Sequence, residues 1–205
     1  MSKATQSAAN SKLPKTLPKV LVFDLDGCCW QPEMFELWSH RSASPFKSTD
    51  GGKTAQTSDG RPVNLIGHVR QILEHLMEHP EVENGNTKLA LASTCDEPDW
   101  ARELLRVFKL THPKTKKEIP MGDLFHAHEI YKAHNKHPHF HAIKKKLSGD
   151  QQQIEFHEMA FFDNQHNNIR DVGKLGVNAI LTPDGVMWEH WVQHFGPKPE
   201  WASRL

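Results

Sequence analysis

Acidic and hydroxyl side chains follow three short apolar segments of the sequence. Asp24 and Asp26 follow the first segment, Ser93 and Thr94 the second, and Asp163 closes the third. Two carboxylates spaced two apart on an extended chain point to the same side, where they repel each other unless a cation or proton intervenes. Carboxylate oxygens favour magnesium. A single Asp after a strand is usually a turn or cap residue, but three polar strand ends together predict a magnesium site.

The apolar segments are the strands that must position these side chains. Four strands are expected, and helical periodicity appears between them. Strands are predicted at 19–26, 88–93, 159–163 and 177–181, and helices at 65–77, 97–108, 140–147, 167–175 and 186–195. This alternation predicts an α/β fold, a Rossmann-like three-layer sandwich with a mainly parallel sheet. Ligand chemistry in such a sheet gathers at the carboxyl ends of the strands.

The chain divides into three parts by composition. Residues 1–18 form a polar flexible lead without an apolar h-region, residues 19–196 form the domain, and residues 197–205 form a C-terminal tail. The lead is not a secretory signal, so a cytoplasmic protein is expected, with organelle import left open. The polar segment 39–62 carries Gly-Gly and Asp-Gly turn signals. It predicts an exposed loop or a loose hairpin that could act as a partial lid.

The amino-acid composition limits the kinds of partner that the protein is expected to bind. Lys and Arg total 25 and Asp and Glu total 25, so the formal net charge is zero and a broad surface for nucleic acid is not expected. No stretch approaches the roughly 18 apolar residues of a membrane helix. Three cysteines make a poor disulfide framework, which favours a reducing compartment. The oligomeric state is left open.

Four motifs, in order, resemble those of a known family. They are FDLDGCCW at 23–30, LALAST at 89–94, EIYKAHNK at 129–136 and FFDNQHNNIRDVGKLGV at 161–177. The chain resembles the haloacid dehalogenase superfamily over residues 18–182, and within it the magnesium-dependent phosphatase one branch, also known as an acid phosphatase family. The resemblance implies a magnesium-dependent phosphomonoester hydrolase.

The same resemblance implies a role for each motif residue. Asp24 matches the nucleophile that takes the phosphoryl group as an aspartyl-phosphate, and Asp26 matches the general acid, whose backbone carbonyl also faces the metal. Asp163 matches the metal ligand, so the implied Mg²⁺ set is Asp24, Asp26 and Asp163. Lys136 matches the lysine that neutralises the nucleophile and the phosphoryl group.

The second motif is implied to bind substrate. Ser93 matches the hydroxyl that hydrogen-bonds the phosphoryl oxygens, and Thr94 stands beside it. Two positions depart from the family pattern. Cys28 replaces the usual Thr or Val, which leaves fine tuning open, because a thiol is a weaker hydrogen-bond partner. Asn164 replaces an acid that relatives often carry, so we expect weaker magnesium binding.

Substrate size follows from the spacing of the motifs. Neither interval between them leaves room for a compact cap domain, so no large cap is expected. An open site would admit a phosphorylated small molecule such as a sugar phosphate, or a phosphotyrosyl side chain on a protein. The alternatives are a catalytically weak phosphate-binding or scaffold protein on the same fold, and a receiver domain, to which the Asp24-Asp26 doublet is foreign.

The chain has fifteen histidines, and several of them surround Lys136. They are His126, His128, His134, His137, His139 and His141. Closely spaced histidines can bind zinc. No Cys pair joins them and the usual metal-site spacings are missing, so a polar loop with solvated imidazoles is favoured. Trp30 and Trp38 could line the substrate entrance.

Overall fold

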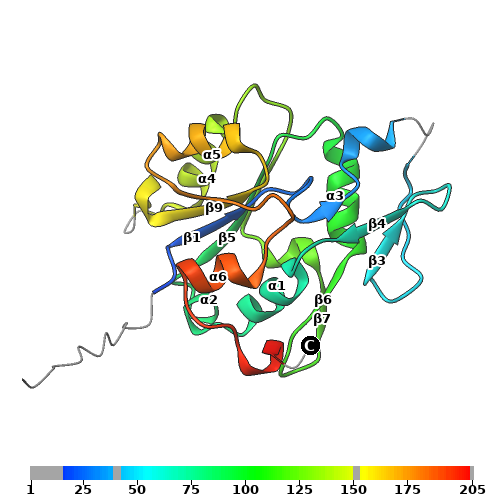
Figure 1. Ribbon diagram of the computed structural model, residues 1–205, viewed down its shortest axis with the longest axis horizontal. Coiled ribbons are helices and arrows are strands. Elements are labelled where there is room, and N and C mark those ends of the chain that lie inside the picture. Colours follow the sequence, from blue (N-terminus) through cyan, green and yellow to red (C-terminus); the bar gives the residue numbers. More distant parts are fainter. Residues whose placement is uncertain (1–15, 39–42, 150–152, 204–205) are drawn as a thin grey trace, which may run out of the picture.

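The computed structural model describes residues 16–38, 43–149 and 153–203. Its centre is a five-stranded sheet with the order β10-β9-β1-β5-β8 and parallel pairing throughout. The strands are β1 (Val20–Phe23), β5 (Lys88–Ser93), β8 (Ala127–Ile130), β9 (Met159–Asp163) and β10 (Asn178–Leu181). The predicted α/β fold with a mainly parallel sheet is confirmed (Figure 1).

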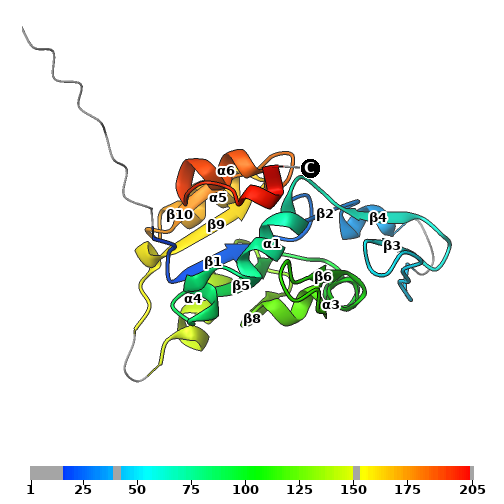
Figure 2. The same cartoon turned by 90° about the horizontal axis from the view of Figure 1, so that it is seen from below.

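Helices cover both faces of this sheet because successive strand residues are apolar on both sides. Leu21 and Phe23 of β1 belong to one hydrophobic core and Val20 and Val22 to the other. One core is completed by α1 (Val69–Met77), α3 (Pro98–Val107) and α6 (Trp188–His194), and the other by α4 (His137–Leu147) and α5 (His166–Gly173). Figure 1 shows α4 and α5 on the opposite side of the sheet from α1 and α6, and Figure 2 shows α1 in front of the strands when the sheet is seen from below.

The edge strand β8 was not predicted. Its sequence, AHEI, is not a continuous apolar run. The strand lies at the sheet edge, where its two central residues are only half-buried and can therefore be polar. The helix expected from residue 65 begins instead at Val69, because Leu65 ends a strand, β4 (Pro62–Leu65). The helix expected from residue 140 begins earlier, at His137, where Pro138 fits the first turn.

A small antiparallel unit lies between β1 and α1. It pairs β2 (Trp30–Gln31) with β4, and β4 with β3 (Thr54–Gln56); the short helix η1 (Met34–Leu37) lies beside it. The segment 39–62 was expected to be an exposed loop or a loose hairpin; β3 lies within it, but the strand that β3 pairs with begins only at Pro62, and residues 39–42 lie outside the described part. Arg70 of α1 donates hydrogen bonds to the carbonyls of Gly52 and Lys53, which ties the hairpin to the core. No large cap domain is inserted among the described residues.

The remaining elements are short and peripheral. They are α2 (Pro80–Glu83), β6 (Lys109–Thr111), β7 (Glu118–Pro120), η2 (Met121–Leu124), η3 (Phe156–Glu158) and η4 (Glu200–Ser203). The last of these lies in the segment expected to be a tail, and there Trp201 Nε1 donates to Glu78 Oε1 at 2.8 Å. Within the described ranges, no helix is both long and apolar enough to cross a membrane.

Candidate active site

The carboxyl ends of β9, β1 and β5 lie side by side and bring three of the motifs together. The register places Phe23 of β1 opposite Leu91 on one side and Phe162 on the other. Asp24 continues this register, and its backbone N–H donates to the carbonyl of Phe162 at 3.0 Å. Asp163 is the last residue of β9. The two carboxylates are therefore neighbours because of the parallel pairing, although they are far apart in the sequence.

Lys136 joins these carboxylates. Its Nζ lies 2.7 Å from Asp24 Oδ1 and 3.1 Å from Asp163 Oδ2, and it also donates to the carbonyl of Ala92 at 2.7 Å. The lysine side chain is 1% exposed. Burial alone would lower the pKa of Lys136, but the charges of Asp24 and Asp163 outweigh it and raise that pKa. The ammonium group is therefore fixed and charged at the bottom of the site.

One ammonium does not balance two buried carboxylates. Burial, and then the charge of Asp24, raise the pKa of Asp163 to about 7, against the opposing effect of Lys136. Asp163 is held in place by the backbone N–H of Gln165, which donates to Oδ1 at 2.7 Å. The Nδ2 of Asn168 donates to both of its oxygens, at 3.2 and 3.0 Å. A further positive charge in this site would keep both acids ionised.

Asp26 is oriented separately from these groups. Trp30 Nε1 donates to its Oδ1 at 2.7 Å, and the backbone N–H of Met34 donates to its Oδ2 at 3.2 Å. Burial raises the pKa of Asp26 to about 7, although the Trp30 hydrogen bond opposes this. Near neutral pH such a carboxyl group exchanges a proton readily, which suits general acid and base chemistry.

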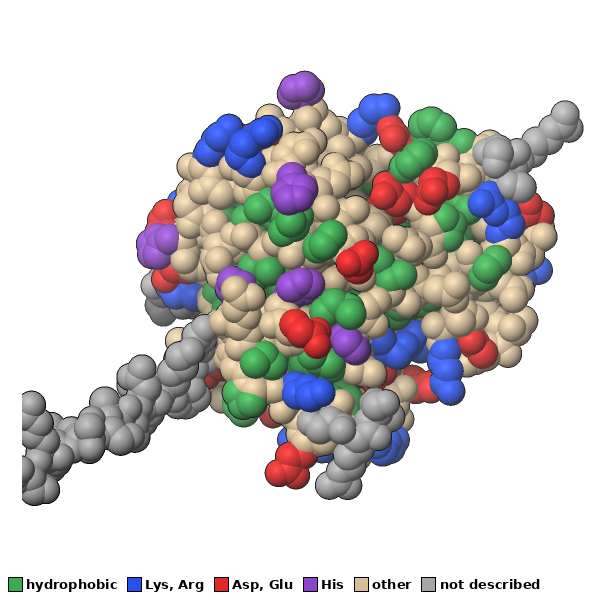
Figure 3. All heavy atoms as spheres, in the orientation of Figure 1, with side chains coloured by type: hydrophobic (Ala, Val, Ile, Leu, Met, Phe, Trp, Pro, Cys, Tyr) green, Lys and Arg blue, Asp and Glu red, His purple; other side chains and the backbone are tan. Residues whose placement is uncertain are grey.

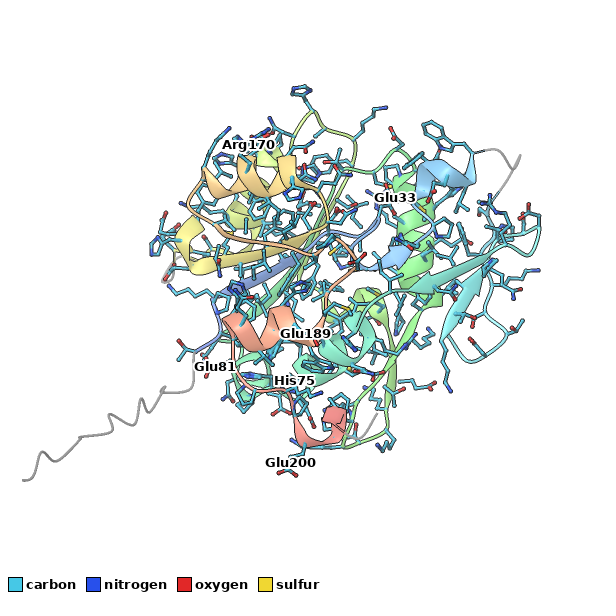
Figure 4. The ribbon with its side chains drawn as sticks, in the orientation of Figure 1. Glu33, His75, Glu81, Arg170, Glu189 and Glu200 are labelled. Atoms are coloured by element: carbon cyan, nitrogen blue, oxygen red, sulfur yellow. The ribbon has the colours of Figure 1, made fainter. Side chains whose placement is uncertain are left out.

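A cavity of about 280 Å³ opens above these groups. Its lining comes from the β1–η1 segment, the end of β5, the β8–α4 loop and the start of α5. The lining residues are Asp24, Asp26, Glu33, Phe35, Thr94, Asp96, His134, Asn135, Lys136, Gln165, Asn167 and Asn168. Figure 4 marks Glu33, which caps η1, and Figure 3 shows acidic beside hydrophobic side chains over η1.

The donor set fits a hard divalent cation. Asp24 and Asp163 supply buried carboxylates, and Asn164 adds an amide oxygen, Oδ1, that is buried without a hydrogen-bond partner. The Nδ2 of the same amide lies against Gly27, whose φ of +70° and lack of a Cβ allow this approach. Oxygen ligands of this kind suit magnesium. Within the described ranges, no cluster of three or more His, Cys, Asp or Glu is placed to hold a metal, so backbone and amide oxygens would complete the set.

The predicted site residues are mostly brought together. Asp24, Lys136 and Asp163 are in direct contact, and Asp26 and Thr94 line the same cavity. Ser93 is 1% exposed and does not line it. Asn168, which holds Asp163, is a contribution that the sequence analysis missed; its only signal was a position on the helix that follows the third acidic strand end.

The histidines around Lys136 do not gather into a metal site. Four of them make hydrogen bonds to different backbone groups, and no metal-binding cluster of three or more His, Cys, Asp or Glu is found in the described part of the chain. His126 accepts from Leu89 N, His137 contacts the carbonyl of Asp171, and His139 is buried. The expectation that Trp30 lines the entrance is wrong, since this residue is fully buried on Asp26. The apolar residue that lines the cavity is Phe35, which is 51% exposed.

Comparison with known proteins identifies the family. Residues 16–196 match the acid phosphatase family. Human magnesium-dependent phosphatase 1 is 32% identical over 170 residues, 83% of this chain and 81% of that protein. A HAD-like hydrolase superfamily protein of Schizosaccharomyces pombe is 29% identical over 166 residues, 80% of this chain and 84% of that protein.

Among solved structures, CbbY from Rhodobacter sphaeroides in complex with phosphate has a TM-score of 0.49 and 14% identity. The match covers 81% of this chain and 86% of that one. The family match and the human relative, each spanning most of the chain, agree with the four motifs and with the acidic site that they build. The chain therefore belongs to the acid phosphatase family, the haloacid dehalogenase-like group that includes human magnesium-dependent phosphatase 1, and it is a phosphatase.

Proposed function

We propose that this phosphatase hydrolyses phosphomonoesters through an aspartyl-phosphate formed on Asp24. The observation that carries the proposal is the buried contact of Lys136 with both Asp24 and Asp163. A carboxylate that attacks a phosphate dianion meets like-charge repulsion, and a fixed ammonium group offsets it. A covalent intermediate divides one difficult hydrolysis into two easier steps.

In the first step the Asp24 carboxylate attacks phosphorus, and Asp26 gives its proton to the departing oxygen. In the second step Asp26 takes a proton from water, which attacks phosphorus and releases phosphate and free Asp24. Both duties need a group that is protonated and ionised in turn near neutral pH, and the pKa of Asp26, raised to about 7, supports this role. Trp30 and the Met34 N–H hold Asp26 in one orientation during both steps.

Asp24, Asp163 and the backbone carbonyl of Asp26 would hold Mg²⁺ in this site. When bound, the ion supplies positive charge that screens the carboxylates and the phosphoryl oxygens from each other. Lys136 keeps Asp24 oriented throughout, and Asn168 keeps both oxygens of Asp163 in place. Thr94, which follows the end of β5 and lines the cavity, would offer its hydroxyl to the phosphoryl oxygens.

The rim of the cavity supports an aryl phosphate, such as a phosphotyrosyl side chain, as the preferred substrate. Phe35 is 51% exposed, lines the cavity and offers an apolar face to an aromatic leaving group. Trp38, the C-cap residue of the same short helix, is 53% exposed. A sugar phosphate is the second candidate, because the polar rim residues Glu33 and Asp96 offer acceptors to hydroxyl groups.

The test is turnover of a panel of phosphate esters, with and without magnesium, by the parent and by Asp24→Asn. The panel contains an aryl phosphate, phosphotyrosyl peptides and sugar phosphates. Hydrolysis by the parent and none by the variant supports the proposal. Equal turnover by both contradicts the nucleophile assignment. No turnover of any ester by a folded, magnesium-loaded parent would favour a catalytically weak phosphate-binding protein on the same fold.

A further inference from the structure

His139 is a buried histidine to which the proposed mechanism gives no role. It lies on α4, three residues after Lys136, and its side chain is fully buried. Residues three apart project from the same side of a helix. The helix that delivers the catalytic lysine therefore delivers an imidazole to the same sheet end.

The contacts of His139 fix its protonation. Its Nε2 lies 3.1 Å from the carbonyl oxygen of Ser93 and 3.2 Å from that of Tyr131. A carbonyl oxygen only accepts, so Nε2 carries the proton and donates to both. The other ring nitrogen, Nδ1, is buried without a hydrogen-bond partner. The imidazole is thus neutral and in a single tautomer, and the Tyr131 ring stacks on it at 4.1 Å.

These two carbonyls belong to the segments that carry the second and third motifs. Ser93 ends β5, and Tyr131 begins the loop that leads from β8 to Lys136. Tyr131 N also donates to Ser93 O, and Lys136 Nζ donates to the carbonyl of Ala92. The side chains of Lys136 and His139 therefore cap three carbonyls at the ends of β5 and β8.

We infer that His139 is a positioning residue: its Nε2–H fixes the end of β5 relative to the Lys136 loop, so that Thr94, which follows Ser93 and lines the cavity, and the lysine keep one geometry. The inference rests on the proposed function, because it assigns the second motif to phosphoryl binding. Small displacements of such groups cost catalysis more than stability.

The chain offers a matched set of variants. In His139→Gln the amide nitrogen stands the same number of bonds from Cα as Nε2 and can donate to both carbonyls. In His139→Phe the ring and its stacking on Tyr131 remain and the donor is lost. His141→Phe, at an exposed position on the same helix, is the control. We expect His139→Phe to lower kcat/KM for an aryl phosphate about tenfold, the effect of one lost hydrogen bond, and His139→Gln to stay within about threefold of the parent.

A double-mutant cycle separates positioning from general support of the fold. If His139 acts through the end of β5 that carries Thr94, His139→Phe costs less than about threefold in a Thr94→Ala background. A full tenfold loss in that background, an equal loss in His139→Gln and His139→Phe, or no loss in His139→Phe would overturn the inference. If His139→Phe does not fold, His139→Asn replaces it, since its shorter amide cannot reach the two carbonyls.

A second readout is independent of turnover. Nitrogen-15 shifts of the His139 ring should show a protonated Nε2 and an unprotonated Nδ1 between pH 6 and 8. An Nδ1-protonated or cationic ring would overturn the inference even in an active enzyme. Conversely, the expected tautomer in a parent that hydrolyses no ester would leave the geometry in place and refute the proposed function instead.

Discussion

At the carboxyl ends of β1 and β9, burial brings two carboxylates and an ammonium group together, whereas between α1 and α6 it brings imidazole and indole rings together. In the first region, Lys136 Nζ lies 2.7 Å from Asp24 Oδ1, and the charges of Asp24 and Asp163 raise the pKa of Lys136 against the effect of burial. In the second, the His75 ring lies 5.4 Å from that of His79 and 5.5 Å from that of Trp191 (Figure 4 marks His75).

Burial disfavours the charged form in both regions, but the first region also supplies groups of opposite charge in direct contact. Burial, and then the neighbouring His79, lower the pKa of His75 to about 4, and its Nδ1 has no hydrogen-bond partner. This histidine is neutral near pH 7 and serves to pack α1 against α6. Burial raises the pKa of Asp163 to about 7 instead, in a site where a lysine and a cation can hold the charge. The difference teaches that the number of histidines does not indicate where the functional site lies in this protein. The buried pair of opposite charges indicates it.

The largest effect is expected at Asp24. Asp24→Asn keeps the shape of the side chain and removes the attacking charge, so turnover of an aryl phosphate should fall to background. Circular dichroism should show an intact fold. Wild-type turnover in this variant would mean that the acidic region is merely structural, like the histidine region.

Lys136→Met should lower turnover by roughly a hundredfold to a thousandfold, because an electrostatic group in a dry site is worth about 3–4 kcal/mol of barrier. The methionine stem keeps much of the packing. Stability is also expected to fall, since removing one partner leaves Asp24 and Asp163 buried together. Lys145→Met, at an exposed position, is the control. Equal losses in the two variants would show that the third motif is misplaced.

Removal of magnesium should abolish activity, and its return should restore it. Magnesium should also raise the melting temperature of the parent, because it binds only where folding has brought Asp24 and Asp163 together. The rise should be smaller in Asp163→Asn. Full activity in excess chelator would reject the metal assignment, and stronger restoration by zinc would revive a role for the histidines.

The smallest effect concerns His75 and appears in stability alone. The unfolded chain protonates this histidine below its ordinary pKa of 6.5, while the folded chain keeps it neutral down to a pKa of about 4. Stability is therefore lost as pH falls between these values and changes no further below them. Relative to His75→Phe, the parent should lose on the order of 1 kcal/mol between pH 7.5 and 5, after allowance for partial exposure.

Urea unfolding at the two pH values measures this difference. The exposed His157, replaced in the same way, serves as the control. An identical pH dependence in His75→Phe and the parent would show that His75 titrates as it does in water. The histidine region would then not be an example of a buried group whose pKa is shifted by its surroundings.

Much of the fold followed from the sequence, because its central strands are buried on both faces and read as apolar runs. Val20–Phe23 and Met159–Asp163 are fully buried and were predicted on that ground. The edge strand β8 could not be predicted in this way, because its two central residues, His128 and Glu129, are polar and only partly buried. Local periodicity also cannot show that Leu65 pairs in a strand rather than opening the next helix.

The part of the site that consists of motif residues could be predicted from the sequence. Asp24, Lys136 and Asp163 were named from the sequence and are in contact. The hydrogen bond from Trp30 to Asp26 and the one from Asn168 to Asp163 could not be predicted. Both depend on side-chain orientations that only the folded backbone fixes. From the sequence alone, the Trp30 indole could face either the cavity entrance or a buried carboxylate. Only the packing of the folded chain determines which of the two it contacts.

The order of strands in the sheet has a consequence for how the protein is made. β1 is central, yet its neighbours β5 and β9 come from the middle and the last quarter of the chain. During synthesis Asp24 emerges first, and Lys136 and Asp163 emerge long afterwards. Until β9 emerges, the edge of β1 that faces β9 is unpaired and Asp24 has no neighbouring Asp163. Stalling the ribosome after α4 should therefore yield a chain whose first strand is still open to proteases and chaperones.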